Sequence, residues 1–244
     1  MALKEQEARS AVATKDRFLA AASHDMRQPV MALSLYAEHL VAYPEMHLEL
    51  APKIATASLA VKHLFESLFD LANLDSGKVV LHVQPVNVAE VLIGLVVQFG
   101  PLAAAKNIEL RVRGADATVQ TDSVRLQRMI GNVLGNAIKY SPSGTKILLA
   151  VRAHAGRVRV EVWDQGYGIP QGDMDKVFQE FYRVDRADTP SIDGIGLGLS
   201  IVSRLSRVLN TQIAINSVVG RGTRFSLCVS DVAPQAAAAS LDVG

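Results

Sequence analysis

Hydrophobic residues follow two different patterns along the chain, and the change falls near residue 77. From Leu3 to Gly77 apolar residues recur at heptad spacing with almost no strand signal, which predicts two long helices. The second helix, which follows Pro52, is apolar over more of its surface than one partner helix can cover. We therefore expect a helical hairpin that pairs with a second copy as a dimeric four-helix bundle. The seam of the first helix comprises Leu19, Ala22, Met26, Leu33, Tyr36 with Ala37, and Leu40.

Beyond residue 77 strand patterns and helix patterns are mixed, which indicates an α/β sandwich domain and makes the whole chain α+β. Residues 232–244 have no core-forming pattern and are predicted to be a tail or linker. The expected domains are therefore 1–77, 78–231 and 232–244. Strands are predicted near 79–83, 108–113, 117–121, 145–152, 157–164, 211–217 and 223–229, and helices near 87–104, 122–140 and 196–209.

The composition excludes several classes of site and partner. The chain has 244 residues and a formal net charge of +1 with its Lys and Arg scattered, so we expect no nucleic-acid contact and no direct membrane contact. The one cysteine, Cys228, excludes an internal disulfide and a multi-cysteine metal site. The longest uncharged apolar run, Val91 to Ala105, is too short to span a bilayer, and the first residues are charged rather than apolar like a signal peptide.

The stretch SHDMRQP at 23–29 sets His24 beside Asp25 on the first expected helix. His24 falls nearly opposite the apolar seam, so its imidazole is expected to face solvent. A neighbouring carboxylate can accept the proton of one ring nitrogen while the other attacks, and Pro29 bends the helix at a cost of about 3 kcal/mol. Met31 and Leu35 lie on the same outer face and suggest a docking surface, for a partner or for the second domain. The residues alone leave an inconsequential surface histidine as the alternative.

A polar arc marks the helix expected at 122–140. Its four residues share about 100° of helical surface beside an apolar arc. Amide oxygens suit a hard cation such as Mg²⁺ and lysine suits phosphate, although an ordinary amphipathic helix has a similar pattern. Gly131 and Gly135 favour the ligand, because a helical glycine costs about 1 kcal/mol and is expected only where something approaches closely. The arc consists of Asn132, Asn136, Lys139 and Tyr140.

Three further stretches bring polar or glycine residues to places where a ligand could bind. In RVRVEVWDQGYGIP the alternation points Asp164 inward, where an adenine amino group would satisfy the carboxylate; an ordinary turn is the alternative. Gly166 and Gly168 let the backbone turn close to such a ligand. Thr223 has the parity of the inward residues of its strand. In GIGLGLSIVSRL three glycines run into a helix whose N-terminal amides can receive phosphate: Gly194, Gly196 and Gly198.

In this order and spacing, the stretches resemble those of a sensor histidine kinase over residues 1 to about 230. FLAAASHDMRQPV looks like the phospho-acceptor box, GNVLGNAIKYS the asparagine box, DQGYGIP the first glycine box, FQEFYRVD the phenylalanine box and GIGLGLSIV the second glycine box. The resemblance implies an ATP-binding sandwich of the gyrase and histidine-kinase type. It also implies that residues 165–195 form a mobile lid over the nucleotide.

The resemblance further implies a role for each residue of the polyphosphate side. Asn136 would hold Mg²⁺, and Asn132 and Lys139 would contact phosphates or support the metal. Arg183 would reach the γ-phosphate. The second glycine box would cradle phosphate through its backbone, so that Ile195, where threonine is common, should cost little. Its cradle residues are Gly194, Gly196, Leu197 and Gly198.

On the base side, the resemblance implies that Asp164 reads the adenine amino group, with Thr223 assisting through water. Tyr140 would stack near the base. The lid would be anchored by two aromatic residues, Phe178 and Phe181.

The implied reaction is attack of a His24 ring nitrogen on the γ-phosphoryl group of MgATP, with Asp25 accepting the other ring proton. The phosphoryl group would then pass to an aspartate of a response-regulator receiver domain. Gln28 stands where many members carry the Thr or Asn that orients water in the reverse, phosphatase reaction; glutamine can also orient water. Two rival functions are a degenerate kinase acting as a dimeric scaffold and a gyrase-type ATPase module. Intact nucleotide residues argue against the first, and the exposed His24–Asp25 pair argues against the second.

The expected partners follow from the same resemblance. They are a second copy of the chain, a receiver domain, and an upstream sensory domain outside this chain that signals through the helix beginning at Leu3. The expected location is cytoplasmic, either as a free protein or as the cytoplasmic part of a membrane-bound sensor.

Overall fold

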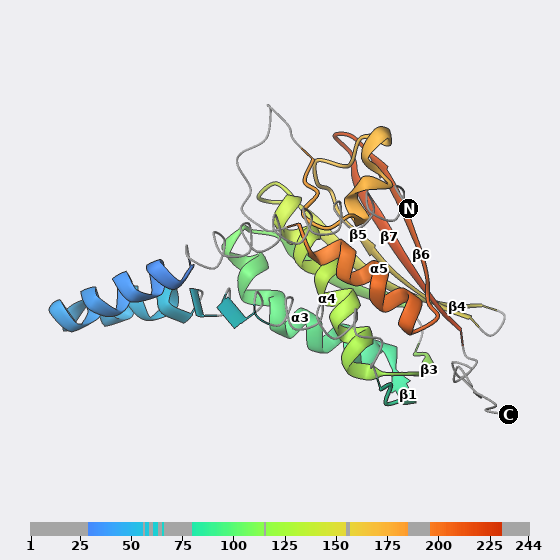
Figure 1. Cartoon of the computed structure of the whole chain (residues 1–244), viewed down its shortest axis with the longest axis horizontal. Coiled ribbons are helices and arrows are strands. Elements are labelled where there is room, and N and C mark those ends of the chain that lie inside the picture. The colour runs from blue at the N-terminus through green and yellow to red at the C-terminus, as the bar shows by residue number, and fades with distance from the viewer. Residues whose placement is uncertain are drawn as a thin grey trace, which may run out of the picture.

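The computed structural model describes residues 29–55, 57–58, 61–62, 65, 80–114, 116–154, 157–184 and 196–230. Residues 29–42 and 47–55 are helical, with a short 3-10 helix, η1 (Pro44–Met46), between them. Figure 1 shows the chain turning back on itself at this point. The predicted helical hairpin is therefore confirmed in its described part. His24, Asp25 and Gln28 lie outside the described residues, as does the tail.

The hairpin leaves many of its apolar side chains uncovered. Leu33, Tyr36 and Leu40 of the expected seam are only half-buried. On other faces of the same helix Met31 is 63% exposed and Val41 83%. Such a surface needs further partners, as the expected bundle would provide.

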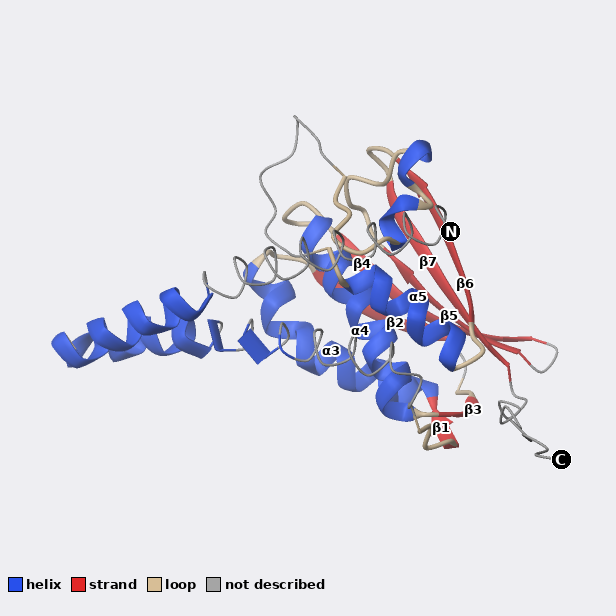
Figure 2. Cartoon of the chain, in the orientation of Figure 1, coloured by secondary structure: helices blue, strands red, loops and turns tan. Residues whose placement is uncertain are grey.

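The second domain is a layer of helices on one face of a mixed five-stranded sheet (Figure 2). The sheet order is β2-β4-β5-β7-β6; β2 and β4 are parallel, and all other neighbours are antiparallel. The helices are α3 (Val88–Ala105), α4 (Ser123–Tyr140) and α5 (Gly198–Val208). The strands of the sheet are β2 (Glu109–Gly114), β4 (Lys146–His154), β5 (Arg157–Trp163), β6 (Gln212–Val218) and β7 (Gly222–Ser230). These elements confirm the predicted α/β sandwich.

One predicted strand is misplaced. Residues 80–83 have no regular structure, and the strand β1 follows at Gln84–Asn87. β1 pairs antiparallel with β3 (Thr118–Thr121), with Val86 opposite Val119 and both side chains buried. The apolar run before β1 was misleading because Val80 is 68% exposed; pairing with β3, rather than local hydrophobicity, decides where the strand lies.

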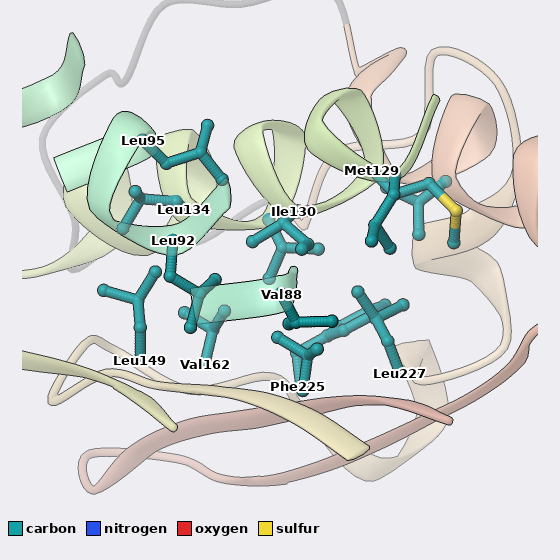
Figure 3. Close-up of a cluster of buried hydrophobic side chains, with 14 of the residues drawn as sticks. Val88, Leu92, Leu95, Met129, Ile130, Leu134, Leu149, Val162, Phe225 and Leu227 are labelled. Carbon is teal, nitrogen blue, oxygen red and sulfur yellow. The ribbon is translucent and has the colours of Figure 1, made fainter. Parts of the chain in front are cut away.

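The core lies between the helices and the sheet (Figure 3). Val88 and Leu92 of α3 and Ile130 of α4 point toward strand residues such as Val162 and Phe225, and all five are at most 3% exposed. The strict alternation of β5 buries Val158, Val160 and Val162, as its sequence predicted.

The two glycines of α4 do not serve a ligand as expected. A Cβ at Gly131 would lie 3.3 Å from the Leu95 side chain and 3.7 Å from Phe99, and one at Gly135 would lie 3.5 Å from Phe99. What approaches closely is therefore α3. These glycines let two helices pack, and they carry no evidence about a ligand.

Candidate functional site

The asparagine arc of α4 meets the first residue of α5. A Cβ at Gly198 would lie 3.4 Å from Nδ2 of Asn136 and 3.5 Å from Oδ1 of Asn132. Asn132 also donates from Nδ2 to the carbonyl of Arg128, which directs its Oδ1 toward α5. The structure thus brings together two stretches that are 62 residues apart, and a Cβ at position 198 would be in van der Waals contact with both amides.

The start of α5 is suited to an anion. Among the described residues no side chain caps its first turn, because the buried Leu197 at the N-cap position has no hydrogen-bond acceptor in its side chain. The free N–H groups and the positive end of the helix dipole favour negative charge there. Gly196 has φ +78°, and a Cβ would come within 2.9 Å of the Phe181 backbone, so glycine is required. Gly194 and Ile195 lie outside the described residues.

Positive charge gathers at the carboxyl end of α4. Nζ of Lys139 lies 5.0 Å from the centre of the Tyr140 ring. Burial raises the pKa of Tyr140, and the positive charge of Arg183 opposes that rise, which places the guanidinium near the same ring. The predicted residues Lys139, Tyr140 and Arg183 are therefore neighbours.

Asp164 points inward and is held by backbone amides. Its Oδ1 accepts hydrogen bonds from the N–H of Gly166, at 2.8 Å, and of Thr223, at 3.0 Å. Burial raises the pKa of Asp164, and these two N–H groups oppose the rise. Within the described part of the chain no group donates to Oδ2. One carboxylate oxygen thus positions the side chain, and the other can accept a hydrogen bond from a ligand.

The Thr223 hydroxyl belongs to a pair that the sequence did not reveal. Its Oγ1 lies 2.8 Å from Oγ of Ser217 on β6, and Ser217 also accepts from the N–H of Ile169 at 2.7 Å. The parity of Ser217 with Ile213 and Ile215 was the available signal. A cavity of about 720 Å³ is lined by residues that include Asp164, Thr223, Ser217 and Phe178. Asn132 and Asn136 do not line it.

The loop after Asp164 threads closely between two elements. The N–H of Tyr167 donates to the carbonyl of Tyr140, and Gly220 donates to the carbonyl of Tyr167. A Cβ at Gly166 would lie 2.7 Å from the Tyr140 carbonyl oxygen. At Gly168, which has φ +69°, a Cβ would lie 2.2 Å from the Val218 oxygen. The predicted glycines are therefore required by backbone contact.

The first part of the expected lid is built from the short 3-10 helices η2 (Gln171–Asp173) and η3 (Lys176–Phe178). Phe178 and Phe181 pack against the core, and the Phe178 ring lies 6.3 Å from that of Phe225. Glu180 forms an ion pair with Arg204 of α5. These contacts tie the described lid residues to the sheet and to α5.

Lys106 is a site residue that sequence reasoning missed. Its Nζ donates to the carbonyls of Ile138, Lys139 and Ser141, at 2.8, 3.0 and 2.8 Å. A cation is favourable at a helix carboxyl end, where the last carbonyls have no partner within the helix. Burial lowers the pKa of Lys106. The residue comes from the end of α3, so only the packing of two helices could reveal it.

We predict that Asp164→Asn stabilises the ligand-free fold at pH 7. Because burial raises the pKa of Asp164 in the folded state, this carboxyl ionises at a lower pH in the unfolded chain. At pH 7 the folded state therefore holds a partly buried charge, which lowers the free energy of unfolding. Asparagine keeps an acceptor for the two amides and removes the charge. Thermal melts should show a higher Tm for the variant at pH 7, with the difference closing as pH falls through the pKa of Asp164. A lower Tm for the variant at pH 7 would contradict the burial cost.

We predict that Lys106→Met lowers the free energy of unfolding by about 1–3 kcal/mol, because three carbonyl oxygens lose a charged donor. Lys146→Met is the matched control: Lys146 is 55% exposed and pairs with Glu109 only at 3.7 Å, so its loss should cost less than about 1 kcal/mol. Urea titration of both variants measures the difference. Equal losses would show that Lys106 does not hold the end of α4.

Two family models match the chain. Residues 14–77 match the His Kinase A (phospho-acceptor) domain, and residues 121–232 match the histidine kinase-, DNA gyrase B- and HSP90-like ATPase. The sensor-like histidine kinase SenX3 of Mycolicibacterium smegmatis is 31% identical over 225 residues, which cover 90% of this chain and 58% of the relative. The chain thus spans little more than half the length of that relative.

Solved structures show the same fold. The mycobacterial sensor histidine kinase MprB aligns with a TM-score of 0.54 and 27% identity, over 61% of this chain and 97% of that one. The histidine kinase ThkA, solved in complex with the response regulator protein TrrA, aligns with a TM-score of 0.64 and 21% identity over 92% of this chain and 64% of that one. The two matched domains, in this order and with these relatives, place the chain in the family of the two-component sensor histidine kinases.

Proposed function

We propose that this chain is the ATP-dependent autokinase part of its protein and that it phosphorylates itself on His24. The observation that carries the proposal is the contact of Gly198 with the amides of Asn132 and Asn136. It sets an uncapped helix N-terminus, suited to phosphate, directly beside two amide side chains. An ordinary amphipathic helix has no need of this arrangement.

The polyphosphate of ATP would bind along this contact. The first amides of α5 would receive phosphate oxygens, and Lys139 and Arg183 would supply positive charge from the end of α4 and from the lid. The Asn136 amide forms no hydrogen bond with any described residue, so its oxygen is available to a hard cation. Asn136 would hold Mg²⁺, which neutralises the charge of the transferred group when bound.

The adenine would bind at the other end of the site. Oδ2 of Asp164 would accept the exocyclic amino group, while Oδ1 stays held by two amides. Thr223 and Ser217 would bind ring nitrogens directly or through water, since their hydroxyls lie 2.8 Å apart and both residues line the same cavity as Asp164. Tyr140 would stack at the boundary between base and phosphate.

In the proposed reaction a neutral His24 ring nitrogen attacks the γ-phosphorus of ATP. The new N–P bond forms as the bond to the β–γ bridging oxygen breaks, and ADP leaves with that electron pair. Asp25 accepts the proton of the other ring nitrogen. Imidazole suits this role because its ordinary pKa of about 6.5 leaves it largely neutral at pH 7. The protein contributes position and charge neutralisation.

The phosphoryl group would then pass to an aspartate of a response-regulator receiver domain. The chain would act as a homodimer, because the hairpin exposes apolar side chains that a four-helix bundle would cover. We place the chain in the cytoplasm, with its sensory input from an upstream domain. A degenerate scaffold and a gyrase-type ATPase remain the rival functions, and ATP turnover without stable phosphoprotein would favour the second.

We predict that His24→Ala abolishes the incorporation of phosphate from γ-labelled ATP, because the attacking nitrogen is lost, while ADP binding is unchanged. Asn136→Ala is the complementary variant: it should keep His24 and lose magnesium-dependent nucleotide affinity. Acid-labile, alkali-stable labelling followed by mapping of the modified residue is the measurement. Labelling that persists in His24→Ala would assign the phospho-acceptor to another residue.

We predict that Gln28→Ala slows the release of phosphate from a phosphorylated receiver domain, because the glutamine amide would orient the attacking water. Autophosphorylation from ATP should be nearly unchanged, which makes it the internal control. Equal rates of phosphate release by the variant and the parent protein would remove Gln28 from this reaction.

A further inference from the structure

Glu161 of β5 is a buried carboxylate that the proposed reaction does not use. It is 2% exposed and alternates with the core residues Val160 and Val162, so it lies on the face of the sheet away from the helices (Figure 2). Two arginines face it: Nη2 of Arg224 lies 3.4 Å from Oε1, and Nε of Arg152 lies 3.4 Å from Oε2. A buried ion pair is weak evidence for stability, because apolar side chains in its place often stabilise a fold equally well. What such a pair can fix is the arrangement of its neighbours.

Glu161 holds two side chains at the end of the β5–β7 ladder. The indole Nε1 of Trp163 donates to Oε2 of Glu161 at 3.1 Å, and Cζ of Arg224 lies 4.9 Å from the centre of the Trp163 ring. Trp163 and Arg224 are directly opposite each other in the register of the two strands. One carboxylate therefore joins both members of a cross-strand pair. We call Glu161, Trp163 and Arg224 the outer clamp.

The outer clamp lies directly behind two residues of the candidate site. Asp164 follows Trp163 in the chain, and Thr223 precedes Arg224. The N–H of Asp164 donates to the carbonyl of Thr223 at 2.9 Å, and the N–H of Thr223 donates to Oδ1 of Asp164 at 3.0 Å. Because successive side chains of a strand point to opposite faces, the clamp and the Asp164 carboxylate lie on opposite sides of the sheet.

The clamp stands where the ladder would otherwise be weakest. Trp163 and Arg224 form the last pair of the β5–β7 register before the chain enters the loop after Asp164, and backbone at such an end opens more easily than backbone in the middle of a sheet. Asp164, Trp163 and Arg224 all line the 720 Å³ cavity, whereas Glu161 does not. An effect of Glu161 on a bound base must therefore pass through the residues that it holds.

We propose that Glu161 is a positioning residue for the adenine base: through Trp163 and Arg224 it fixes the place at which Asp164 presents Oδ2. The inference rests on the proposed function, in which Oδ2 accepts the exocyclic amino group of adenine. Hydrogen bonds weaken steeply as distance and angle depart from their best values, so an acceptor that is held rigidly selects its donor more sharply. Loosening the clamp should therefore reduce selectivity for the base.

Calorimetric titration of the full-length chain with two nucleoside diphosphates tests the proposal. The parent protein should bind ADP about tenfold or more tightly than inosine diphosphate, which has a carbonyl oxygen in place of the amino group of adenine. In Glu161→Gln this preference should fall by about threefold or more, because the two ion pairs are lost and an amide donor meets a guanidinium. Glu109→Gln is the matched control: Glu109 is an exposed carboxylate of β2 that pairs with Arg111 at 2.6 Å, and its loss should leave the preference unchanged.

Two further measurements test the route from Glu161 to the base. Trp163 is the one tryptophan of the chain, so its fluorescence emission should change in Glu161→Gln and stay as in the parent in Glu109→Gln. In an Asp164→Asn background, Glu161→Gln should cause no further change in the preference for ADP, because the acceptor that it positions is already gone. Unchanged emission in Glu161→Gln, or a full additional effect in the Asp164→Asn background, would contradict the route.

Two arginine variants give a second comparison if Glu161→Gln does not fold. Both guanidinium groups lie 3.4 Å from the Glu161 carboxylate, but Arg224 also lies over the Trp163 ring, and Arg152 is on the neighbouring strand β4 with 68% of its side chain exposed. Arg224→Met should lower the preference for ADP as Glu161→Gln does, whereas Arg152→Met should keep it. Equal preferences in the two variants would exclude the clamp as the route.

The outcomes separate this proposal from the proposed function. A parental preference for ADP in a folded Glu161→Gln variant would remove Glu161 from the site and leave the adenine assignment standing. A loss of affinity that is equal for both diphosphates would show that Glu161 has a structural role alone. No preference for ADP in the parent protein would refute the adenine assignment, and the positioning role with it.

Discussion

The contact between the first residue of α5 and the two asparagines of α4 is the constraint on which the rest of the site depends. It combines a glycine at 198, a helix that starts with leucine at its N-cap, and an asparagine held by its own helix backbone. The core beneath α4 and α5 keeps these groups in place, because both helices bury their apolar sides against the same sheet. Rigid packing on one side therefore positions polar groups on the other.

The site also contains features that lower the stability of the fold. Asp164 is a half-buried carboxylate, and its pKa is raised because burial takes its charge partly out of water, which is unfavourable. Gly166 and Gly168 leave the adjoining loop without the restraint that side chains would give. Lys106 offsets part of the cost at the other end by satisfying three carbonyls. Such local compromises gather at functional sites and are balanced by the surrounding core.

Helix α3 supports this site from its inner side. Its inner side supports α4 through Leu95 and Phe99, which fit against Gly131 and Gly135, and its last turn leads into Lys106, which holds the end of α4. By length and composition this helix is apolar enough to cross a membrane, and it packs on the domain core through Leu92 and Leu95.

The sequence alone predicted the features that depend on the local periodicity and spacing of residues within one helix or strand. The alternation of β5 predicted both its buried valines and the inward Asp164, and the 3.6-residue period of α4 gathered its polar arc, because both follow from backbone geometry. Contacts between distant segments were decided only by tertiary structure. They include the pairing that moved the first strand to Gln84–Asn87, the role of Gly131 and Gly135, and the parts played by Ser217 and Lys106. Such contacts depend on how whole elements pack, and no single stretch of residues encodes that packing.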